Sequence, residues 1–363
     1  MPTPLPPALP ATPQGSAPER PHLLGQTQRA LESWARTQGS TEAAARVVAQ
    51  ALLAEATGRI RKASASAPSR TLLAKAAAAF ARTLPEVEAI PDPDGTVRFA
   101  VKLHDGAIVE TVLIHQEGRD TVCVSSQVGC RRGCVFCETG RLGLKRDLAA
   151  WEIVAQYAIA ARYQQARGVP APGNVVYMGM GEPLDNLDSV IASIDVLREH
   201  AGFAVAERRI TVSTVGIVPE MDALFARTKA NLAVSLHALQ PEVRKALLPV
   251  AHKWGLDELR AAIARAPRTV LLQWTLIEGQ NDSAADAELL VRFCEGLDVR
   301  VNLIPLNPGP IAAQRAPTLE RCRVFQKRLL DARLRAMLRL PHGQTVGGAC
   351  GQLAGARRAT KDR

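Results

Sequence analysis

Short apolar runs alternate with helical stretches along the chain from residue 120 onward. Six of these runs have the length and the content of β-branched residues typical of buried strands, namely TVCVSS, NVVYMGM, RITVST, NLAVSL, VLLQWTLI and VRVNLIP. The segments between them repeat apolar residues at helical spacing, over residues 149–167, 187–200, 219–226, 241–247, 256–264 and 283–296. Strands that alternate with helices form a parallel sheet. The pattern therefore predicts an α/β fold with a partial βα barrel over residues 118–340, to which the run LRAMLRL would add a seventh or edge strand.

A β-hairpin extension is expected before the barrel, over residues 94–117. The runs TVRFAVKL and AIVETVLIH alternate apolar and polar positions around the turn sequence HDG. On the second run Ile108, Glu110, Val112 and Ile114 share one face of the strand. A carboxylate in an apolar stripe is costly to bury unpaired, and Glu is usually exposed. The pattern alone leaves open whether Glu110 has a function or is simply exposed at the rim of a groove.

Residues 26–90 predict a small helical accessory domain, because Ala, Leu, Arg and Gln dominate their composition. Helices are expected over residues 27–37, 42–58 and 69–83, with the N-cap pair Ser40-Thr41 before the second. A Pro-rich tail, expected to be disordered, precedes them over residues 1–25. The helices and the linker over residues 59–68 carry basic residues with few acids, at Arg46, Arg59, Arg61, Lys62, Arg70, Lys75 and Arg82. These residues form either an RNA-contacting surface or a solvated face.

Composition narrows the class of protein. The chain has 363 residues, 47% of them hydrophobic, and a formal net charge of +10. The basic balance favours a polyanionic partner, whereas an aromatic content of 4% provides no evident platform for stacking bases. The sequence contains no run of about 18 apolar residues and no apolar segment at its N-terminus, so neither a membrane span nor a signal peptide is expected. We therefore expect a cytoplasmic enzyme.

Three cysteines within the run CRRGCVFC carry the candidate chemistry: Cys130, Cys134 and Cys137. Three thiolates so close together cannot all pair as disulfides, but they can bind three irons of a [4Fe–4S] cluster, which normally takes four cysteine ligands. The fourth iron then stays open to a small molecule, which is the signature of radical S-adenosylmethionine (SAM) chemistry. Zinc is the alternative, yet zinc needs a fourth Cys or His at ligand spacing, and neither His104 nor His115 has that spacing. Thiolate ligation also implies a reducing compartment.

Further candidate residues follow the predicted strands. The active site of a βα barrel lies at the C-terminal ends of its strands, and the cysteine run follows the first of them. The residues at the ends of later strands are Gly181, Glu182, Ser213, Ser235, Leu236, His237 and Asn307. Singly, such residues are common in turns. As a set they predict a pocket for the amino-acid group and ribose of SAM, in which Glu182 can accept a hydrogen bond from an ammonium group.

Several longer motifs resemble the RlmN/Cfr family of radical SAM RNA methyltransferases, which methylate a ring carbon of adenine. They cover roughly residues 97–355 and are ETVLIH, CVSSQVGC, CRRGCVFC with TGRLGLKRDL, MGMGEPLDN, TVSTVGIVP, SLHAL, NLIPLNP and ACGQLAG. Most radical SAM enzymes share only the three-cysteine run, whereas two of these motifs add Cys123 and Cys350. The resemblance implies a [4Fe–4S] cluster and SAM as cofactors and rRNA or tRNA as the substrate. It also implies an external electron donor, no membrane association and no obligate protein partner.

The resemblance further implies roles for the matching residues. The three clustered cysteines bind the iron, and the strand-end residues contact SAM. Cys350 receives a methyl group from a first SAM, and a second SAM is cleaved to a 5′-deoxyadenosyl radical that takes a hydrogen from the methylated cysteine. The resulting carbon radical adds to adenine, with carbon 2 favoured over carbon 8. Glu110 then accepts a proton, and Cys123 releases the product by forming a transient disulfide with Cys350.

Elementary chemistry is consistent with these roles. A ring carbon of adenine is not nucleophilic, so it cannot take a methyl group directly from the sulfonium of SAM. A carbon radical, in contrast, can add to the ring. The covalent adduct must then be released, and a thiolate within reach of Cys350 does so by attacking its sulfur. Without the resemblance, Cys123 would be interpreted as a small buried hydrophobe and Cys350 as a lone tail thiol. Cys294 and Cys322 lie on helical stretches, where core packing is their expected role.

The chain departs from the family in segments expected to touch the substrate. Where the family has RKTRGDDI before the C-terminal cysteine, this chain has RLPHGQTV over residues 339–346, and the family's NPFPG is NPGP over residues 307–310. The N-terminal helices also lack the FRAxQ…W opening. The same chemistry on a non-RNA substrate therefore stays open as an alternative. The Gly-rich segment over residues 341–363, which carries Cys350, is expected to be mobile.

Overall fold

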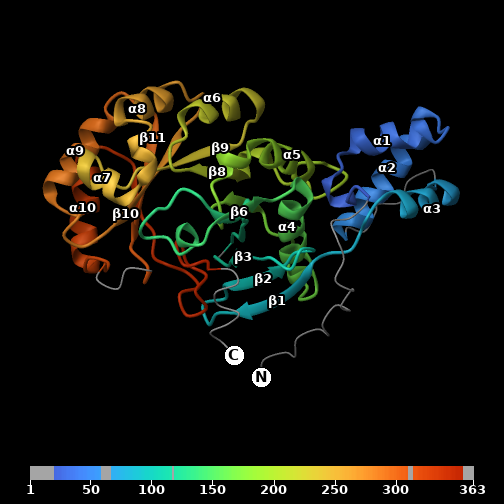
Figure 1. Cartoon of the computed structure of the whole chain (residues 1–363), viewed down its shortest axis with the longest axis horizontal. Coiled ribbons are helices and arrows are strands. Elements are labelled where there is room, and N and C mark those ends of the chain that lie inside the picture. The colour runs from blue at the N-terminus through green and yellow to red at the C-terminus, as the bar shows by residue number, and fades with distance from the viewer. Residues whose placement is uncertain (1–19, 59–66, 117, 310–313, 355–363) are drawn as a thin grey trace.

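A curved ten-stranded sheet forms the centre of the molecule (Figure 1). The structure is a computed structural model that describes residues 20–58, 67–116, 118–309 and 314–354. The strand order is β1-β2-β3-β4-β7-β8-β9-β10-β11-β12, and every neighbouring pair from β4 to β12 is parallel. The parallel strands are β4 (Thr121–Cys123), β7 (Asn174–Tyr177), β8 (Ile210–Thr214), β9 (Asn231–Ser235), β10 (Val270–Leu276), β11 (Val299–Pro305) and β12 (Ala336–Leu338). The predicted partial barrel is confirmed, and the run LRAMLRL supplies the edge strand β12.

Helices follow the parallel strands and cover the outer face of the curved sheet (Figure 1). They are α4 (Ala150–Gln165), α5 (Leu187–Leu197), α6 (Val218–Arg227), α7 (Pro241–Leu247), α8 (Leu256–Ala264), α9 (Ala284–Cys294) and α10 (Leu319–Asp331). Buried aromatic residues pack between the two layers, for example Trp274 on β10 against Phe325 on α10, with ring centroids 6.0 Å apart. Cys294 and Cys322 are buried in this core, as expected for helical cysteines without a motif.

The predicted hairpin is present as β2 (Val97–Lys102) and β3 (Ile108–Ile114), and β3 pairs antiparallel with β4. The hairpin therefore continues the barrel sheet. A further strand, β1 (Glu86–Pro91), pairs antiparallel with β2 and was not predicted. It lies in the range assigned to the helical domain. Its sequence EVEAIP carries two glutamates and ends in proline, so it lacks the apolar signal of a buried strand, and pairing along the sheet edge decides its structure.

Three helices form the N-terminal module, close to the predicted positions: α1 (Gln28–Thr37), α2 (Glu42–Thr57) and α3 (Arg70–Ala79). Side chains of Thr27, Thr41 and Ser69 cap their N-termini. The expected disordered tail is wrong for residues 20–25, because Leu23 and Leu24 are buried in a short 3-10 helix, η1 (Leu23–Gly25). Residues 1–19 and 59–66, with most of the expected tail and linker, lie outside the described residues.

Two basic residues of this module form ion pairs with acidic residues, which the sequence pattern did not indicate. Arg46 contacts Glu42 and Glu32, and Arg82 forms an ion pair with Glu55. Glu42 lies one turn before Arg46 on the same helix, whereas Glu32 and Glu55 come from other parts of the module, which the spacing along the sequence does not show. Arg59, Arg61 and Lys62 lie outside the described residues. None of the helices in the described part of the chain combines the length and the apolar character needed to cross a bilayer.

Candidate active site

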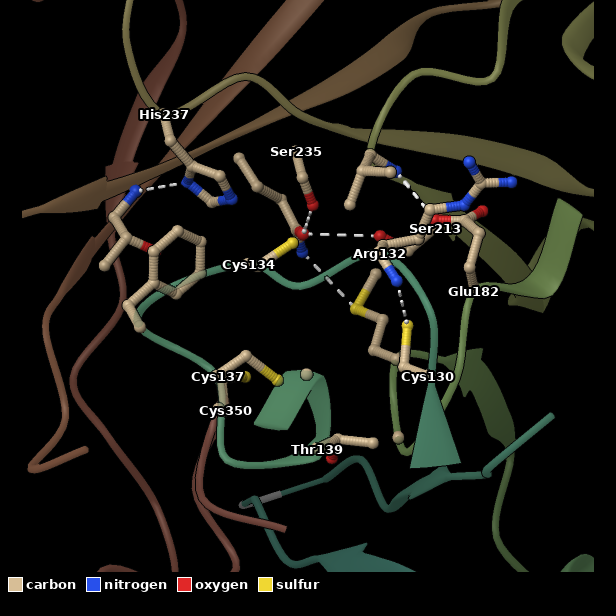
Figure 2. A pocket seen from close by; sticks show the side chains of 18 of the residues that line it. Cys130, Arg132, Cys134, Cys137, Thr139, Glu182, Ser213, Ser235, His237 and Cys350 are labelled. Atoms are coloured by element: carbon tan, nitrogen blue, oxygen red, sulfur yellow. Dashed lines mark hydrogen bonds between the residues drawn. The ribbon is translucent and has the colours of Figure 1, made fainter. Parts of the chain in front are cut away.

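A pocket opens at the C-terminal ends of the parallel strands (Figure 2). Its space of about 970 Å³ includes the part open to solvent. The predicted site residues that line it are Cys130, Cys134, Cys137, Gly181, Glu182, Ser213, Ser235, His237, Asn307 and Cys350. The tertiary structure thus brings together residues from five strand ends and the C-terminal segment.

The three clustered cysteines lie on a loop between two short strands, β5 (Gln127–Cys130) and β6 (Gly143–Asp147), which pair antiparallel and were not predicted. Cys130 ends β5. Beyond it, the main chain turns back through a hydrogen bond from Cys137 N to Cys134 O of 3.1 Å, and a second 3-10 helix, η2 (Thr139–Arg141), closes the turn. Figure 2 shows the three side chains around one open space.

The donor set fits a [4Fe–4S] cluster. All three thiols are free rather than bridged, and desolvation by the pocket walls raises the pKa of Cys130 to about 12 and raises those of Cys134 and Cys137. Bound iron would displace these protons. Among the described residues, no group of three or more Cys, His, Asp or Glu is close enough to hold a single metal ion. The three free thiols around one space are the residues that would hold the cluster.

Glycine allows the close approach that shapes this loop. Gly129 has a φ of +80°, and a Cβ atom there would lie 1.8 Å from the carbonyl oxygen of Gly143 on β6. The strand register also shifts between Val128 and Gly129, which marks a bulge. No side chain larger than hydrogen fits at this crossing, so Gly129 sets the path of the chain directly before Cys130.

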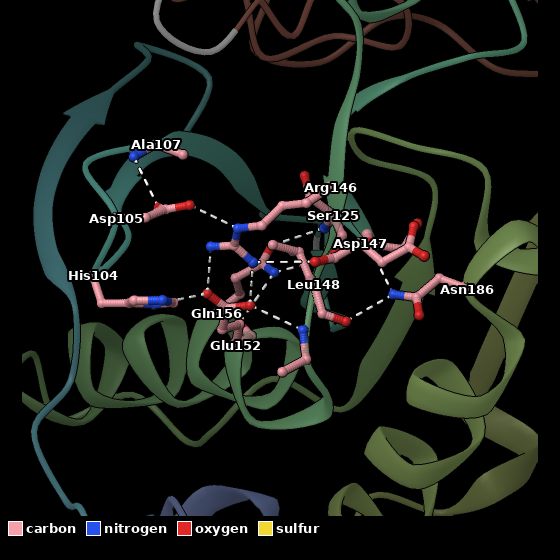
Figure 3. A network of polar contacts seen from close by, with 12 residues as sticks. His104, Asp105, Ala107, Ser125, Arg146, Asp147, Leu148, Glu152, Gln156 and Asn186 are labelled. Atoms are coloured by element: carbon pink, nitrogen blue, oxygen red, sulfur yellow. Dashed lines mark hydrogen bonds and ion pairs between the residues drawn. The ribbon is translucent and has the colours of Figure 1, made fainter. Parts of the chain in front are cut away.

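A polar network supports β6 from behind (Figure 3). Arg146 on β6 donates to both oxygens of Glu152 on α4, at 2.8 and 2.9 Å, and to Asp105 in the β2–β3 turn at 2.7 Å. The hydrogen bond from Arg146 is the main reason that the pKa of Asp105 falls to about 2. On the other side, Asn186 donates to the carbonyls of Ser126 and Leu148. The network joins the hairpin, the cysteine loop and α4 into one framework.

Glu182 is buried and accepts hydrogen bonds from Leu184 N at 3.1 Å and Val215 N at 2.9 Å. Burial raises its pKa to about 7. The two hydrogen bonds act in the opposite direction but are outweighed by burial. Ser213 and Ser235 lie on neighbouring strands and contact the same side-chain oxygen of Gln273, at 3.4 and 3.5 Å. Gln273 lines the pocket too, but sequence reasoning missed it. Its position as a polar residue within the otherwise apolar run VLLQWTLI could have indicated a place in the pocket.

His237 is fixed in one tautomer. Its Nδ1 accepts a hydrogen bond of 2.9 Å from Thr275 N, which leaves the proton on Nε2, and its ring meets Phe136 edge-on at 4.9 Å. Burial, and then the charge of Arg244, lower its pKa to about 3, so the ring stays neutral. Leu236 is fully buried beside it. Unlike the other predicted strand-end residues, Leu236 does not line the pocket.

The glycines of the MGMGE motif serve the protein's own packing. A Cβ atom at Gly181 would lie 2.7 Å from the Cβ of Gln127, and one at Gly179 would lie 2.7 Å from the side-chain oxygen of Ser125. Glycine at such a position commonly lets the backbone approach a ligand closely. The structure shows instead that they let this loop press against the strand leading into the cysteine loop, although Gly181 still lines the pocket.

Cys350 lies at the pocket wall, and its thiol is exposed. Desolvation by the surrounding chain raises its pKa, while nearby Arg339 opposes that shift. Cys123 is buried on β4 and does not line the pocket. Burial raises the pKa of Cys123, and the proximity of Cys350 raises it further. The two cysteines are therefore close enough to interact, although both are free thiols here.

Glu110 is not exposed at a rim. It is buried on β3, forms an ion pair with Arg98 on β2, and accepts a hydrogen bond of 2.6 Å from Ala354 N. The cation on the adjacent strand is what makes burial of this carboxylate possible, and cross-strand register cannot be read from one strand's pattern. Glu110 lies outside the pocket lining but contacts the chain four residues beyond Cys350.

Comparison with known proteins identifies the group to which the chain belongs. Residues 124–290 match the model of the radical SAM superfamily. A probable RNA methyltransferase from Sorangium cellulosum is 42% identical over 350 residues, covering 93% of this chain and 88% of that protein. The chain belongs to the RlmN family of radical SAM RNA methyltransferases. A dual-specificity RNA methyltransferase RlmN from Syntrophobacter fumaroxidans is 44% identical, over 72% of this chain and 77% of its own length.

A solved structure supports the same membership. The crystal structure of a radical SAM methyltransferase from Sphaerobacter thermophilus superposes with a TM-score of 0.83 at 37% identity, covering 92% of this chain and 99% of the other. The match extends well beyond the barrel to the N-terminal and C-terminal parts. Members of the radical SAM family use a [4Fe–4S] cluster and SAM, which agrees with the donor set and the pocket described above.

Proposed function

We propose that this enzyme methylates a ring carbon of adenine, with carbon 2 favoured, in rRNA, tRNA or both, through a methylated Cys350. One observation carries the proposal: the exposed thiol of Cys350 lies at the wall of the same pocket as the three cluster cysteines. A thiol in that place can receive a methyl group from a bound SAM and present it to a radical formed in the same pocket. The names of the similar proteins, which are RNA methyltransferases, support RNA as the substrate.

The residues around the pocket divide the work. Cys130, Cys134 and Cys137 would hold the cluster, which, together with SAM and an external electron donor, supplies a 5′-deoxyadenosyl radical. The residues that would hold SAM are Gly181, Glu182, Ser213, Ser235, Leu236, His237 and Asn307. Glu182 is suited to the ammonium group because it is the buried carboxylate of this wall. Ser213 and Ser235 share Gln273 and so present their hydroxyls side by side.

Product release would use the two residues behind the pocket wall. After the carbon radical adds to adenine, Glu110 would take the ring proton while the ring radical gives up one electron, which a bound iron–sulfur cluster could accept. Cys123 would then attack the sulfur of Cys350, forming a disulfide and breaking the bond from that sulfur to the methylene carbon, which takes a proton and becomes the methyl group of adenine. The electrostatic coupling of Cys123 with Cys350 supports this pairing. The hydrogen bond from Ala354 to Glu110 holds the carboxylate against the segment that carries Cys350.

The experiment uses the anaerobically purified protein. Intact-mass and peptide analysis should find one added methyl group on Cys350, and Cys350→Ala should lose RNA methylation while keeping its iron. Cys123→Ala should accumulate a covalent protein–RNA adduct, visible as an RNase-sensitive shift in gel mobility, because methyl transfer proceeds and release does not. Free turnover by Cys123→Ala would contradict the release role. Nucleoside analysis of rRNA and tRNA incubated with the enzyme identifies the modified carbon, and methyl-Cys350 without RNA methylation would point to another substrate.

A further inference from the structure

The segment after β12 bridges the two ends of the open sheet. At one end, Arg339 N donates to Leu303 O on β11 at 2.9 Å, and at the other end residues 342–346 meet the β1–β2 turn. Figure 1 shows this C-terminal segment beside β1 and β2. The expectation that the segment is mobile is therefore wrong for residues 341–354, whereas residues 355–363 lie outside the described part. Cys350 follows this bridge by four residues and precedes Ala354, which is bonded to Glu110, so contacts on both sides bear on where the thiol lies.

Asp92 supplies the main anchor on the turn. One of its side-chain oxygens, Oδ2, accepts three hydrogen bonds: from Thr345 Oγ1 at 2.5 Å, from Thr345 N at 3.1 Å and from Val346 N at 3.3 Å. Its other oxygen accepts from Asp94 N at 3.1 Å. Asp92 is 9% exposed, and no Lys or Arg among the described residues forms an ion pair with it. The carboxylate is thus satisfied by neutral donors, of which the C-terminal segment provides most.

Neighbouring contacts extend the anchor. Oδ2 of Asp94 accepts from Gly343 N at 2.9 Å and lies 3.4 Å from Nδ1 of His342. Gly343 has a φ of +65°, and a Cβ atom there would lie 2.8 Å from Thr96 on the turn. The segment can therefore approach the turn this closely only with glycine at that position.

A second group of contacts holds the chain on either side of the thiol. Asn307 Nδ2 donates to Cys350 O at 3.0 Å, and its oxygen accepts from Gln344 Nε2, also at 3.0 Å. Gly351 O accepts from Glu138 N at 2.8 Å in the cysteine loop. The bond from Gln344 to Asn307 links the docked residues 343–346 to the amide group that holds the carbonyl of Cys350.

We propose that Asp92 is a positioning residue, whose carboxylate docks residues 342–346 on the β1–β2 turn and thereby holds Cys350 at the pocket lined by the cluster cysteines. The β1–β3 extension then has a defined task in the reaction. Asp92 anchors residues that precede Cys350, Thr345 and Val346, and Glu110 anchors Ala354, which follows it. The expected effect on methylation of Cys350 rests on the proposed function, whereas the docking of residues 342–346 on the turn does not.

The test compares Asp92→Ala with the wild type, both loaded with the cluster. Hydrogen exchange of the peptide that includes the amides of Thr345 and Val346 should be at least about tenfold faster in the variant, the factor expected when a charge-assisted hydrogen bond is lost. The rate at which Cys350 gains a methyl group from SAM should fall by at least the same factor. Iron content and SAM affinity should match the wild type, because the pocket walls are untouched. A general loss of stability would instead speed hydrogen exchange throughout the protein and lower its iron content and SAM affinity as well.

Finer variants separate docking from folding. Thr345→Val removes one of the three bonds to Asp92 and should give a smaller loss, whereas Thr345→Ser keeps the hydroxyl and should restore wild-type exchange and methylation. Glu86→Ala is the matched control, since it removes an exposed carboxylate paired with Lys102 on the same hairpin, and it should change nothing. Wild-type rates of exchange and methylation in Asp92→Ala and Thr345→Val would overturn the proposal. Absence of methyl-Cys350 in the wild type would overturn the proposed function, and hydrogen exchange alone would then decide the docking.

Discussion

Burial sets the charge of single side chains around the pocket. His237 is 4% exposed and Glu182 is 2% exposed, and desolvation moves their pKa values in opposite directions, to about 3 and about 7. Both shifts favour the neutral form, because a charge buried without an opposite charge is costly. A bound ammonium group would shift Glu182 towards its ionised form, because a nearby opposite charge lowers the pKa of a buried carboxyl group.

The lowered pKa of His237 predicts an acid-sensitive contribution to stability. The unfolded chain binds a proton on this residue below about pH 6.5, whereas the folded chain does so only near pH 3. The stability from neutral His237 is therefore present above pH 6.5 and is lost as the pH falls. His237→Asn removes the titration, and Asn tolerates the φ of +56° at this position. The stability advantage of the wild type over this variant should shrink by roughly 2 kcal/mol between pH 7.5 and pH 5.

Denaturant unfolding of the cluster-free wild type and variant at the two pH values measures this difference. His252→Asn serves as the control, because His252 is exposed, and its substitution should leave the pH dependence of the wild type intact. A gap between wild type and His237→Asn that does not change with pH would show that His237 can be protonated in the folded state.

At the level of elements, the cysteine loop depends on two short strands that cross in close contact. β5 and β6 carry few apolar residues, QVGC and GLKRD, so neither shows the run expected of a strand. The loop between them is nevertheless closed by main-chain hydrogen bonds and supported by Arg146 and Glu152 (Figure 3). The pair therefore positions Cys130 through backbone geometry, in addition to the burial of β5.

Substitution of Gly129 by Ala should disrupt the cysteine loop while leaving the barrel folded. The new Cβ atom would collide with the carbonyl of Gly143 at 1.8 Å, so β5 and β6 would have to separate and Cys130 would move. We expect Gly129→Ala to lose most of its bound iron and its SAM cleavage, with a circular dichroism spectrum like that of the wild type. Gly143→Ala is the matched control: its φ of +67° is similar but nothing lies within 4 Å, so it should retain the iron. Equal iron content in the two variants would rule out the close crossing.

Across the whole molecule, ion pairs decide which basic residues remain available to RNA. The net charge is +10, but Arg132 in the cysteine loop binds Asp185 with both ends of its guanidinium, and Arg131 lies 3.8 Å from the same carboxylate. The charges of these two arginines are thus partly neutralised. Arg119 and Arg339 are exposed and lie near each other and near Cys350, and no described acid forms an ion pair with either.

This arrangement predicts an RNA phosphate contact at Arg119 and Arg339. Each phosphate contact contributes roughly 0.7 to 0.9 to the slope of log K against log salt. Replacing both arginines with Ala should therefore lower the magnitude of that slope by roughly 1.5 and weaken binding of RNA irrespective of its sequence. Arg323→Ala combined with Arg328→Ala removes equal charge from the exposed face of α10 and should leave the slope near the wild-type value. If both double variants behaved alike, the effect would come from net charge and not from a site.

The order of strands and helices, the cysteine run and the set of strand-end residues were determined by the sequence, because each depends on residues close together in the chain. Apolar periodicity marks the parallel strands, and the spacing of the thiols marks the candidate iron ligands. Other features needed the tertiary structure. β1 forms because β2 offers it an edge, Glu110 can be buried because Arg98 lies opposite, and Gln273 joins the pocket because its strand lies beside those of Ser213 and Ser235. The docking of Cys350 by Asp92 likewise joins residues more than 250 positions apart, and no local pattern records a contact that only folding creates.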